Sequence, residues 1–239
     1  MAIRAVLWDI DDTLFDYTGS DRTGALRHLA AEGLLAAQEG EEHALRLWGE
    51  VMESAFGRFL AGELGFLEHR RERARGFLGE PLPDDEADAW FGRYIEHYEA
   101  AWTLFPDTLP ALDALADGYR HGVVSNSSLP NQDRKLRILG LRDRFEVLLC
   151  ADELGCAKPA AEAFLAGCDA LGLPPEQVAY VGDRADVDAR GATEAGLLGI
   201  WLDRADTGDA SGLPRITGLA QLPALLRGDT RFGAPSTIG

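Results

Sequence analysis

The stretch AVLWDIDDTLFD, residues 5–16, decides how the rest of the sequence is interpreted. It opens with an apolar run long enough for a buried strand, and this run ends abruptly in acid. Four carboxylates follow within eight positions, at Asp9, Asp11, Asp12 and Asp16. Like charges this close repel one another, so a folded chain tolerates them at a strand end only with compensation. The question is whether the run is a solvated turn or a place for chemistry.

The composition of the chain is that of a soluble globular protein. Its 239 residues are 46% hydrophobic and 26% charged, enough for one large domain or for a core with a second, smaller one. The net charge of −17 argues against binding to nucleic acid or to an anionic membrane, because both need a basic surface. No apolar stretch approaches the ~18 residues of a membrane span.

The cysteines and the first residues bear on the compartment. Cys150, Cys156 and Cys168 give neither a disulfide framework nor the spacing of a zinc site. The start of the chain reaches acidic residues too soon for a secretory signal. We therefore expect a cytoplasmic protein.

Short apolar runs recur along the chain and predict the strands of a sheet. They lie at residues 5–8, 122–125, 145–150, 178–182 and 198–202. None alternates, which is typical of parallel strands buried on both faces. Helical patterns separate the later runs: one starts at the capping acid Asp107, and the others end before Gly140, Gly172 and Gly196. This alternation predicts a Rossmann-like, doubly wound α/β core with right-handed crossovers.

The interval between Asp16 and Phe105 differs from the rest, because it contains no convincing strand. Amphipathic helices are expected at roughly 21–38, 41–60, 66–78 and 84–102. We therefore predict an α-helical subdomain, residues 17–103, inserted into a core made of residues 1–16 and 104–228. Residues 229–239 lack periodicity and are expected to form a flexible tail.

Polar residues stand where the predicted parallel strands end, and ligands of such sheets bind at that edge. Asp9 and Asp11 stand at the end of the first strand, and Ser125 and Asn126 at the end of the second. The remaining candidates are Asp183 after the fourth strand, Asp188 five positions later, and Lys158.

These residue types suit phosphoryl chemistry on a metal ion. Clustered carboxylates are stable around Mg²⁺, which prefers oxygen ligands and can screen a phosphate from an attacking carboxylate. A hydroxyl at Ser125 and an ammonium at Lys158 can neutralise phosphate oxygens. One carboxylate can be the nucleophile, and a second carboxyl two residues away can act as acid and then as base.

At these residues the sequence resembles the haloacid dehalogenase (HAD)-like hydrolase superfamily. The segment DIDDT, residues 9–13, fits its D-x-D-x-T signature. The later matches are VVSNSS with Ser125, Lys158-Pro159 followed by Phe164, and VGDRADVDARGA with Asp183 and Asp188. Four motifs in order, each at a strand end, are a specific signal. The resemblance spans residues 3 to about 226 and implies that the helical insert is a cap between the first two motifs.

The resemblance also implies a role for each residue. Asp9 would be the nucleophile, and Asp11 the general acid/base that also offers its main-chain carbonyl to Mg²⁺. Thr13 would help to orient Asp11. Phosphate-binding residues would be Thr13, Ser125, Asn126 and Lys158, and the metal site would comprise Asp9, Asp11, Asp183 and Asp188. Within that site Asp183 would be a direct ligand, whereas Asp188 would hold a metal-bound water or Lys158.

Together these features predict a Mg²⁺-dependent phosphatase acting on a small phosphorylated metabolite, either a monomer or a homodimer. A phosphomutase stays open, as does a non-catalytic binding protein of the same fold. A dehalogenase is disfavoured, because that group typically has Tyr-Gly where this chain has Asp11-Asp12. A phosphonoacetaldehyde hydrolase needs a lysine in the cap, and none lies between Asp16 and Phe105.

Several other residues carry weaker expectations. Asp12, where many relatives have glycine, should shape the turn, and Asp186 should be a solvated or capping acid. Arg184 either covers the site or faces solvent. Ser125 could instead cap a helix. We expect the arginines of EHRRERARGF, residues 68–77, to pair with glutamates on a solvated face, and we place Trp48, Trp90 and Trp102 in the core of the insert.

Overall fold

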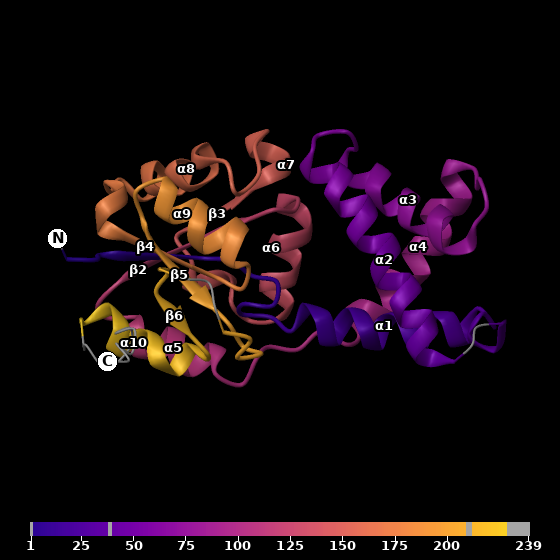
Figure 1. The fold of residues 1–239 in the computed structure, drawn as a ribbon, viewed down its shortest axis with the longest axis horizontal. Coiled ribbons are helices and arrows are strands. Elements are labelled where there is room, and N and C mark those ends of the chain that lie inside the picture. The colour runs from indigo at the N-terminus through magenta and orange to yellow at the C-terminus, as the bar shows by residue number, and fades with distance from the viewer. Residues whose placement is uncertain (1, 38–39, 209–211, 229–239) are drawn as a thin grey trace, which may run out of the picture. The chain divides into compact units, whose positions relative to one another are not determined.

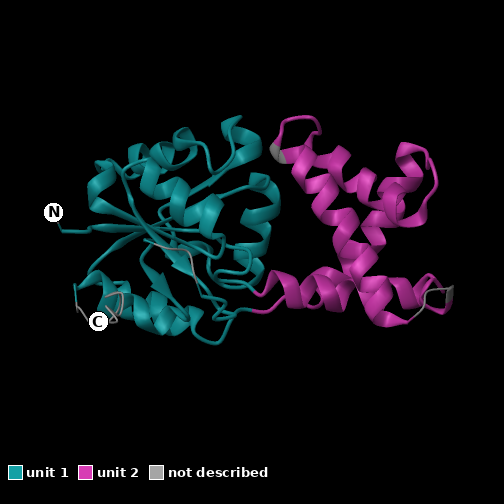
Figure 2. Ribbon diagram, in the orientation of Figure 1, with its two compact units in different colours: residues 1–15, 104–239 teal, residues 16–103 magenta. Residues whose placement is uncertain are grey.

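The chain folds into two compact units, coloured separately in Figure 2. The computed structural model describes residues 2–37, 40–208 and 212–228. Unit 1 comprises residues 1–15 and 104–239, and unit 2 comprises residues 16–103. The predicted tail, residues 229–239, lies outside the described residues. Along the described parts of the chain, no helix has the length and apolar character needed to span a membrane.

Unit 1 is built on a six-stranded parallel sheet with the order β3-β2-β1-β4-β5-β6 (Figure 1). The strands are β1 (Ala5–Trp8), β2 (Arg120–Ser125), β3 (Val147–Cys150), β4 (Val178–Gly182), β5 (Leu198–Leu202) and β6 (Arg215–Ile216). Every residue of β1 and β4 is buried, as their unbroken apolar runs predicted. The doubly wound α/β core is confirmed. Strand β6 was not predicted, because two residues are too few to form an apolar run.

Helices cover both faces of this sheet. They are α5 (Thr108–Leu115), α6 (Leu129–Ile138), α7 (Ala151–Leu154), α8 (Ala161–Leu171), α9 (Gly191–Glu194) and α10 (Leu222–Leu226). Helix α8 packs with α9 on one face, and α5 packs with α10 on the other (Figure 1). Asp107 precedes α5 but does not cap it, contrary to expectation. Its carboxylate instead accepts a hydrogen bond from the Leu219 N–H at 2.8 Å and pairs with Arg204.

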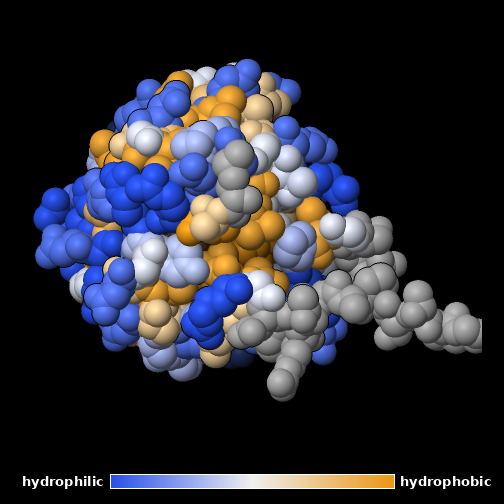
Figure 3. All heavy atoms as spheres, turned by 90° about the vertical axis from the view of Figure 1, so that its left-hand side faces the viewer, coloured by the Kyte–Doolittle hydropathy of each residue, from blue (hydrophilic) through white to orange (hydrophobic). Residues whose placement is uncertain are grey.

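The strand order puts the start of the chain at the centre of the sheet. Strand β1 lies between β2 and β4, where Trp8 is in register with Val123 and with Val181. The residues that follow these three strands therefore meet at one edge, the usual ligand site of such sheets. Figure 3 shows the molecule from the opposite side, where the strands begin, and hydrophobic residues gather there in the middle of the face.

Unit 2 is an all-helical insertion between β1 and β2. Its helices are α1 (Tyr17–Ala31), α2 (Glu41–Leu60), α3 (Phe66–Leu78) and α4 (Asp84–Glu99). Helix α1 packs on α4, and α3 packs on both α2 and α4. Trp48 and Trp90 are buried in the aromatic core of unit 2, as predicted, whereas Trp102 is half-buried.

Helix α1 begins four residues before the predicted start at Asp21. Asp16 caps it, because its carboxylate accepts a hydrogen bond from the Gly19 N–H at 2.9 Å. Gly19 makes this approach possible, since a Cβ there would lie 2.3 Å from the Asp16 carboxylate. Asp21 is instead a buried helix residue, which accepts hydrogen bonds from Trp48 and Arg73.

Candidate active site

The carboxyl edge of the sheet brings three of the predicted acids together. Asp9, Asp183 and Asp188 each offer a carboxylate oxygen, and these oxygens lie within 4.8 Å of one another. Asp9 follows β1 directly, and its N–H donates to the Val181 carbonyl at 2.9 Å. Gly182 ends β4 and lets Asp188 approach, since a Cβ there would lie 2.4 Å from that carboxylate.

Lys158 contacts two of the three clustered acids, Asp9 and Asp188, and is only 3% exposed. Its ammonium donates at 2.7 Å to each of three groups: Oδ1 of Asp9, Oδ1 of Asp188 and the hydroxyl of Tyr180. Burial opposes the charged form of Lys158, but Asp188 and Asp9 outweigh it and raise the pKa of the ammonium. The lysine is therefore a fixed positive charge that faces the nucleophile predicted from the sequence.

Asn126 holds the main chain of this lysine rather than the cluster itself. Its side-chain oxygen accepts from the Lys158 N–H, and its amide donates to the Lys158 carbonyl, both at 2.8 Å. The two bonds fix where the lysine leaves the backbone. The side chain of Asn126 is thus engaged in positioning Lys158, a task that the sequence did not indicate.

The cluster holds three carboxyls and one ammonium. Burial raises the pKa of Asp9 to about 7, against the pull of Lys158, and Asp188 and Asp11 add to the rise. Burial likewise raises the pKa of Asp183 to about 9, with Asp9 and Asp188 contributing. A divalent cation would relieve this repulsion, and an all-oxygen donor set is the kind that Mg²⁺ prefers. These residues therefore fit a Mg²⁺ ion.

Asp11 lies apart from the three clustered carboxylates and is held by α6. Its Oδ2 accepts from the Gln132 amide at 2.9 Å, and its Oδ1 forms an ion pair with Lys135. Thr13 was expected to help orient Asp11. Its buried Oγ1 has no hydrogen-bond partner among the described residues, so that expected bond is absent from this part of the chain.

Ser125 ends β2 and is 2% exposed. Its hydroxyl oxygen accepts a hydrogen bond from the Gln132 amide at 3.1 Å. Ser128, rather than Ser125, stands in the cap position of α6, so the helix-cap interpretation of Ser125 is wrong. The serine is thus linked through Gln132 to Asp11.

Three residues of the site were missed by the sequence analysis: Gln132, Lys135 and Tyr180. Gln132 and Lys135 are three positions apart on a helix and thus share a face, and both are almost fully buried. The Tyr180 hydroxyl accepts from Lys158 and donates to the Val124 carbonyl at 2.8 Å. A tyrosine inside a buried strand needs such a partner, which was the available signal.

The residues with weaker expectations are also placed. Asp12 has φ 59°, a left-handed conformation that favours glycine, so it shapes the turn as predicted. The Arg184 side chain is half exposed and pairs with the exposed Asp186, so it faces solvent. Its N–H donates to Asp188 at 3.0 Å.

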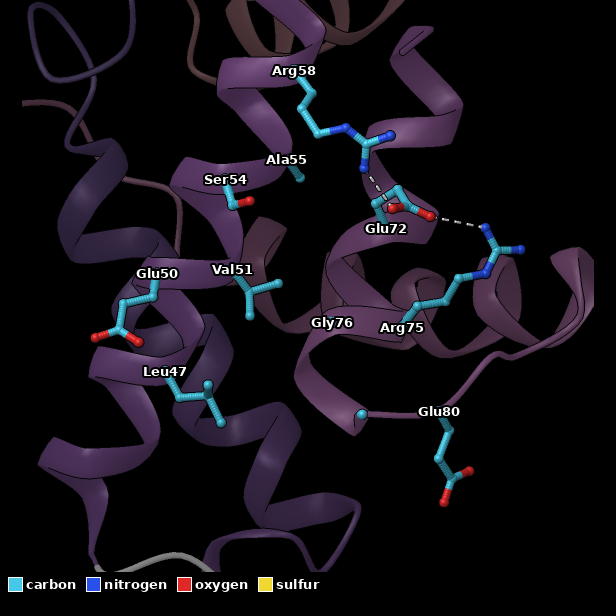
Figure 4. Close-up of a pocket in the computed structure, with 11 residues that line it drawn as sticks. Leu47, Glu50, Val51, Ser54, Ala55, Arg58, Glu72, Arg75, Gly76 and Glu80 are labelled. Atoms are coloured by element: carbon cyan, nitrogen blue, oxygen red, sulfur yellow. Dashed lines mark hydrogen bonds and ion pairs between the residues drawn. The ribbon is translucent and has the colours of Figure 1, made fainter. Parts of the chain in front are cut away.

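Unit 2 has a hollow of about 460 Å³ between α2 and α3 (Figure 4). The guanidiniums of Arg58 and Arg75 both contact Glu72, at 2.8 and 3.3 Å. These arginines are already compensated, so the hollow does not offer an anion an uncompensated positive charge. Arg75 and Arg71 pair with glutamates as the sequence predicted, whereas Arg73 is buried against Asp21.

Comparison with known proteins identifies relatives that match most of the chain. The family model described as haloacid dehalogenase-like hydrolase matches residues 3–196. The glyceraldehyde 3-phosphate phosphatase of Methanopyrus kandleri is 32% identical over 209 residues, which are 84% of each chain. The phosphoglycolate phosphatase of Salmonella typhimurium is 30% identical and covers 83% of this chain and 81% of its own.

Solved structures share the fold. The HAD-hydrolase YfnB from Bacillus subtilis, bound to magnesium, superposes with a TM-score of 0.82 at 19% identity, over 95% of this chain and 100% of that one. The 2-haloacid dehalogenase from Pseudomonas syringae has a TM-score of 0.67 at 28% identity, over 95% and 99% of the two chains.

Proposed function

We propose, from the premise that the chain belongs to the haloacid dehalogenase-like hydrolase family, that it is a Mg²⁺-dependent phosphatase of a small phosphate monoester. The observation that carries the proposal is the cluster of Asp9, Asp183 and Asp188, two of which, Asp9 and Asp188, accept from the buried ammonium of Lys158. Similar proteins act on phosphorylated metabolites, among them glyceraldehyde 3-phosphate and phosphoglycolate.

The proposed reaction has two steps. A carboxylate oxygen of Asp9 attacks phosphorus while the bond to the leaving oxygen breaks, and Asp11 gives that oxygen a proton. Asp11 then takes a proton from water, whose oxygen attacks the phosphorus of the aspartyl-phosphate. Phosphate leaves, and both aspartates regain their starting state. Lys158, fixed beside Asp9, offsets negative charge in both steps.

The metal ligands we propose are Asp9, Asp183 and the main-chain carbonyl of Asp11. Bound Mg²⁺ supplies positive charge that lets a phosphate approach a carboxylate nucleophile. We assign Asp188 a supporting task, because both its oxygens already accept hydrogen bonds, one from Lys158 and one from the Arg184 N–H.

For the phosphate we propose Ser125 and Lys158 as side-chain donors, with the main chain at Asn126 nearby. Ser125 and Asp9 follow neighbouring strands, which favours a shared ligand. Thr13 stays a candidate, since its buried hydroxyl lacks a partner among the described residues. We also propose that unit 2 is the cap that selects the substrate, because it is inserted directly after the D-x-D-x-T segment.

The competing function is a dehalogenase, favoured by the 2-haloacid dehalogenase among similar structures. It would have no use for a carboxyl two residues after the nucleophile, a position that Asp11 occupies here. A phosphomutase would differ only in handing the phosphoryl group back to an organic acceptor rather than to water.

The test assays the purified chain on p-nitrophenyl phosphate, a panel of phosphorylated metabolites and 2-chloropropionate, with Mg²⁺ or with EDTA. We expect phosphate release that needs Mg²⁺ and is abolished by Asp9→Asn. Asp186→Asn, which changes an exposed acid between Asp183 and Asp188, should stay active. Chloride release without phosphate release would overturn the proposal in favour of a dehalogenase. Phosphoryl transfer between two organic hydroxyls, with little free phosphate, would favour a mutase.

A further inference from the structure

The chain has only two lysines, and both lie in the candidate site. Of its 23 basic residues all but Lys135 and Lys158 are arginines. Lys135 is 1% exposed and Lys158 is 3% exposed. Each ammonium contacts one aspartate of the D-x-D segment: Lys158 contacts Asp9, and Lys135 contacts Asp11. The first belongs to a known motif, whereas the second has no role in the function proposed above.

Two contacts restrain the orientation of the Asp11 carboxylate. Lys135 pairs with Oδ1 and the Gln132 amide donates to Oδ2 at 2.9 Å, so each oxygen has its own donor. The ammonium of Lys135 is in turn held over the ring of Phe15, 4.5 Å from its centroid. Neither donor can turn freely, because both lie almost fully buried on one face of α6.

The same helix also connects two parts of the site. The Gln132 amide donates to Ser125 Oγ at 3.1 Å as well as to Asp11. It therefore couples the group proposed to transfer the proton to a hydroxyl proposed to bind the phosphate. A leaving oxygen attached to that phosphate must come within hydrogen-bond reach of Asp11 for proton transfer.

A purely structural role for Lys135 is a poor explanation. Burying an ammonium is costly, and an apolar residue of similar size usually stabilises a core as well or better. The partner of Lys135 is also partly exposed: the Asp11 side chain retains 33% of its accessible surface. A buried cation that pairs with a partly exposed carboxylate serves to hold that carboxylate in place.

We propose that Gln132 and Lys135, the α6 pair, are positioning residues that aim the carboxyl of Asp11 at the leaving oxygen. The inference rests on the proposed function. The α6 pair need not touch the substrate; it acts through Asp11. Its loss should therefore matter most where the leaving group needs a proton.

The experiment compares kcat/KM for two substrates: p-nitrophenyl phosphate, whose leaving group is stable as an anion, and the best alkyl phosphate of the metabolite panel. The ratio kcat/KM depends on the steps up to formation of the aspartyl-phosphate. Hydrolysis of the aspartyl-phosphate, which is the same for both substrates, therefore does not affect the comparison. We expect Lys135→Met and Gln132→Met to lower it on the order of 10- to 100-fold with the alkyl phosphate and only a few-fold with p-nitrophenyl phosphate. Arg137→Met, which removes an exposed charge from the same helix, should change neither.

A double-mutant cycle decides whether the α6 pair acts through Asp11. Adding Lys135→Met to Asp11→Asn should cause no further loss, since the group to be positioned is gone. Additive losses, or equal losses on both substrates, would overturn the inference. If Lys135→Met does not fold, Gln132→Met carries the same test. Failure of the wild type on both phosphate esters would instead refute the proposed function.

Discussion

Each unit of the molecule buries a charged cluster, and the two clusters are built differently. In unit 1, three carboxyls, those of Asp9, Asp183 and Asp188, lie close together, and a single ammonium pairs with two of them, Asp9 and Asp188. In unit 2, one carboxylate faces one guanidinium: Asp21 accepts from Arg73 at 3.2 Å, from the Trp48 indole at 3.0 Å and from the Tyr94 hydroxyl at 2.5 Å. We call the second group the Asp21 cluster.

The difference is one of charge balance. The Asp21 cluster is neutral and its carboxylate has three donors, so it needs nothing from outside. The Arg73 guanidinium is further held about 5 Å from the rings of Trp48 and Phe91. The cluster of unit 1 has carboxyls whose pKa values are raised to about 7 and about 9. Buried charges without a compensating partner indicate a ligand-binding site, whereas compensated buried charges indicate a structural role.

The largest effect should come from breaking the balanced cluster. Arg73→Met leaves the Asp21 carboxylate buried and unpaired, and we expect it to cost about 3–5 kcal/mol of unfolding free energy. Arg22→Met removes an exposed partner of Glu42 in the same unit and should cost about 0–1 kcal/mol. Urea denaturation of both variants measures the difference. Equal costs would contradict the architectural role of the Asp21 cluster.

Removing the ammonium that pairs with Asp9 and Asp188 in unit 1 should damage activity instead. Lys158→Met takes away the positive charge that faces Asp9, and we expect kcat/KM to fall by about 10²–10³-fold. The unfolding free energy should change less than in Arg73→Met, because the clustered acids can take up protons when the ammonium is lost. Steady-state kinetics with circular dichroism as a folding control tests this. A folded, fully active variant would remove Lys158 from the mechanism.

The sequence predicted the unbalanced cluster better than it predicted the balanced one. Asp9, Lys158 and Asp188 stand in short motifs at strand ends, so their meeting follows from the parallel sheet alone. Asp21 was placed at a helix start, and Arg73 on a solvated face. Both errors have one cause: the side of a helix that turns inward is decided by packing against other helices, which no local pattern records.

The same limit explains why the α6 pair was missed. Gln132 and Lys135 contact Asp11 across 121 and 124 residues of chain, so their role depends on how α6 docks on the sheet. Thr13, two residues from Asp11, was the local candidate, but its hydroxyl forms no bond within the described chain. The candidate catalytic groups could be found from local sequence, whereas the groups that hold them in place could not.

Metal addition offers a third test, specific to the unbalanced cluster. Asp9 and Asp183 keep their protons in the fold up to about pH 7 and about pH 9, whereas the unfolded chain releases them near its ordinary pKa of 3.8. The free energy of unfolding of the metal-free protein should therefore fall as the pH rises from near 3.8 to about 9. Mg²⁺ replaces the protons, so the gain in Tm over EDTA should grow with pH.

The free energy of unfolding should rise by about 2.7 kcal/mol when Mg²⁺ is at a hundred times its Kd. Thermal unfolding with Mg²⁺ or EDTA, across the range from about pH 5 to about pH 9, measures it. Asp183→Asn should remove most of the pH dependence, and Asp186→Asn should leave it intact. A gain that is the same at every pH would show that the raised pKa values do not reflect the metal site.

The effect that is smallest at neutral pH concerns a buried group of unit 2 that is outside the Asp21 cluster. His28 is fully buried, packs on Trp90 with ring centroids 4.4 Å apart, and has no hydrogen-bond partner on either ring nitrogen among the described residues. Burial lowers its pKa from 6.5 to about 4, which outweighs the opposing pull of Glu32. The folded protein thus keeps His28 neutral where the unfolded chain takes up a proton.

Stability should therefore fall as pH drops from 6.5 toward about 4, by up to about 1.4 kcal/mol for each pH unit. His28→Phe should flatten this slope, whereas His43→Phe, which changes a half-buried histidine of the same unit, should not. Urea denaturation at several pH values gives both slopes. An unchanged slope in His28→Phe would assign the acid sensitivity of unit 2 to another group. A flattened slope would show that the buried imidazole of His28 contributes to the acid sensitivity of unit 2, apart from the balanced Asp21 cluster.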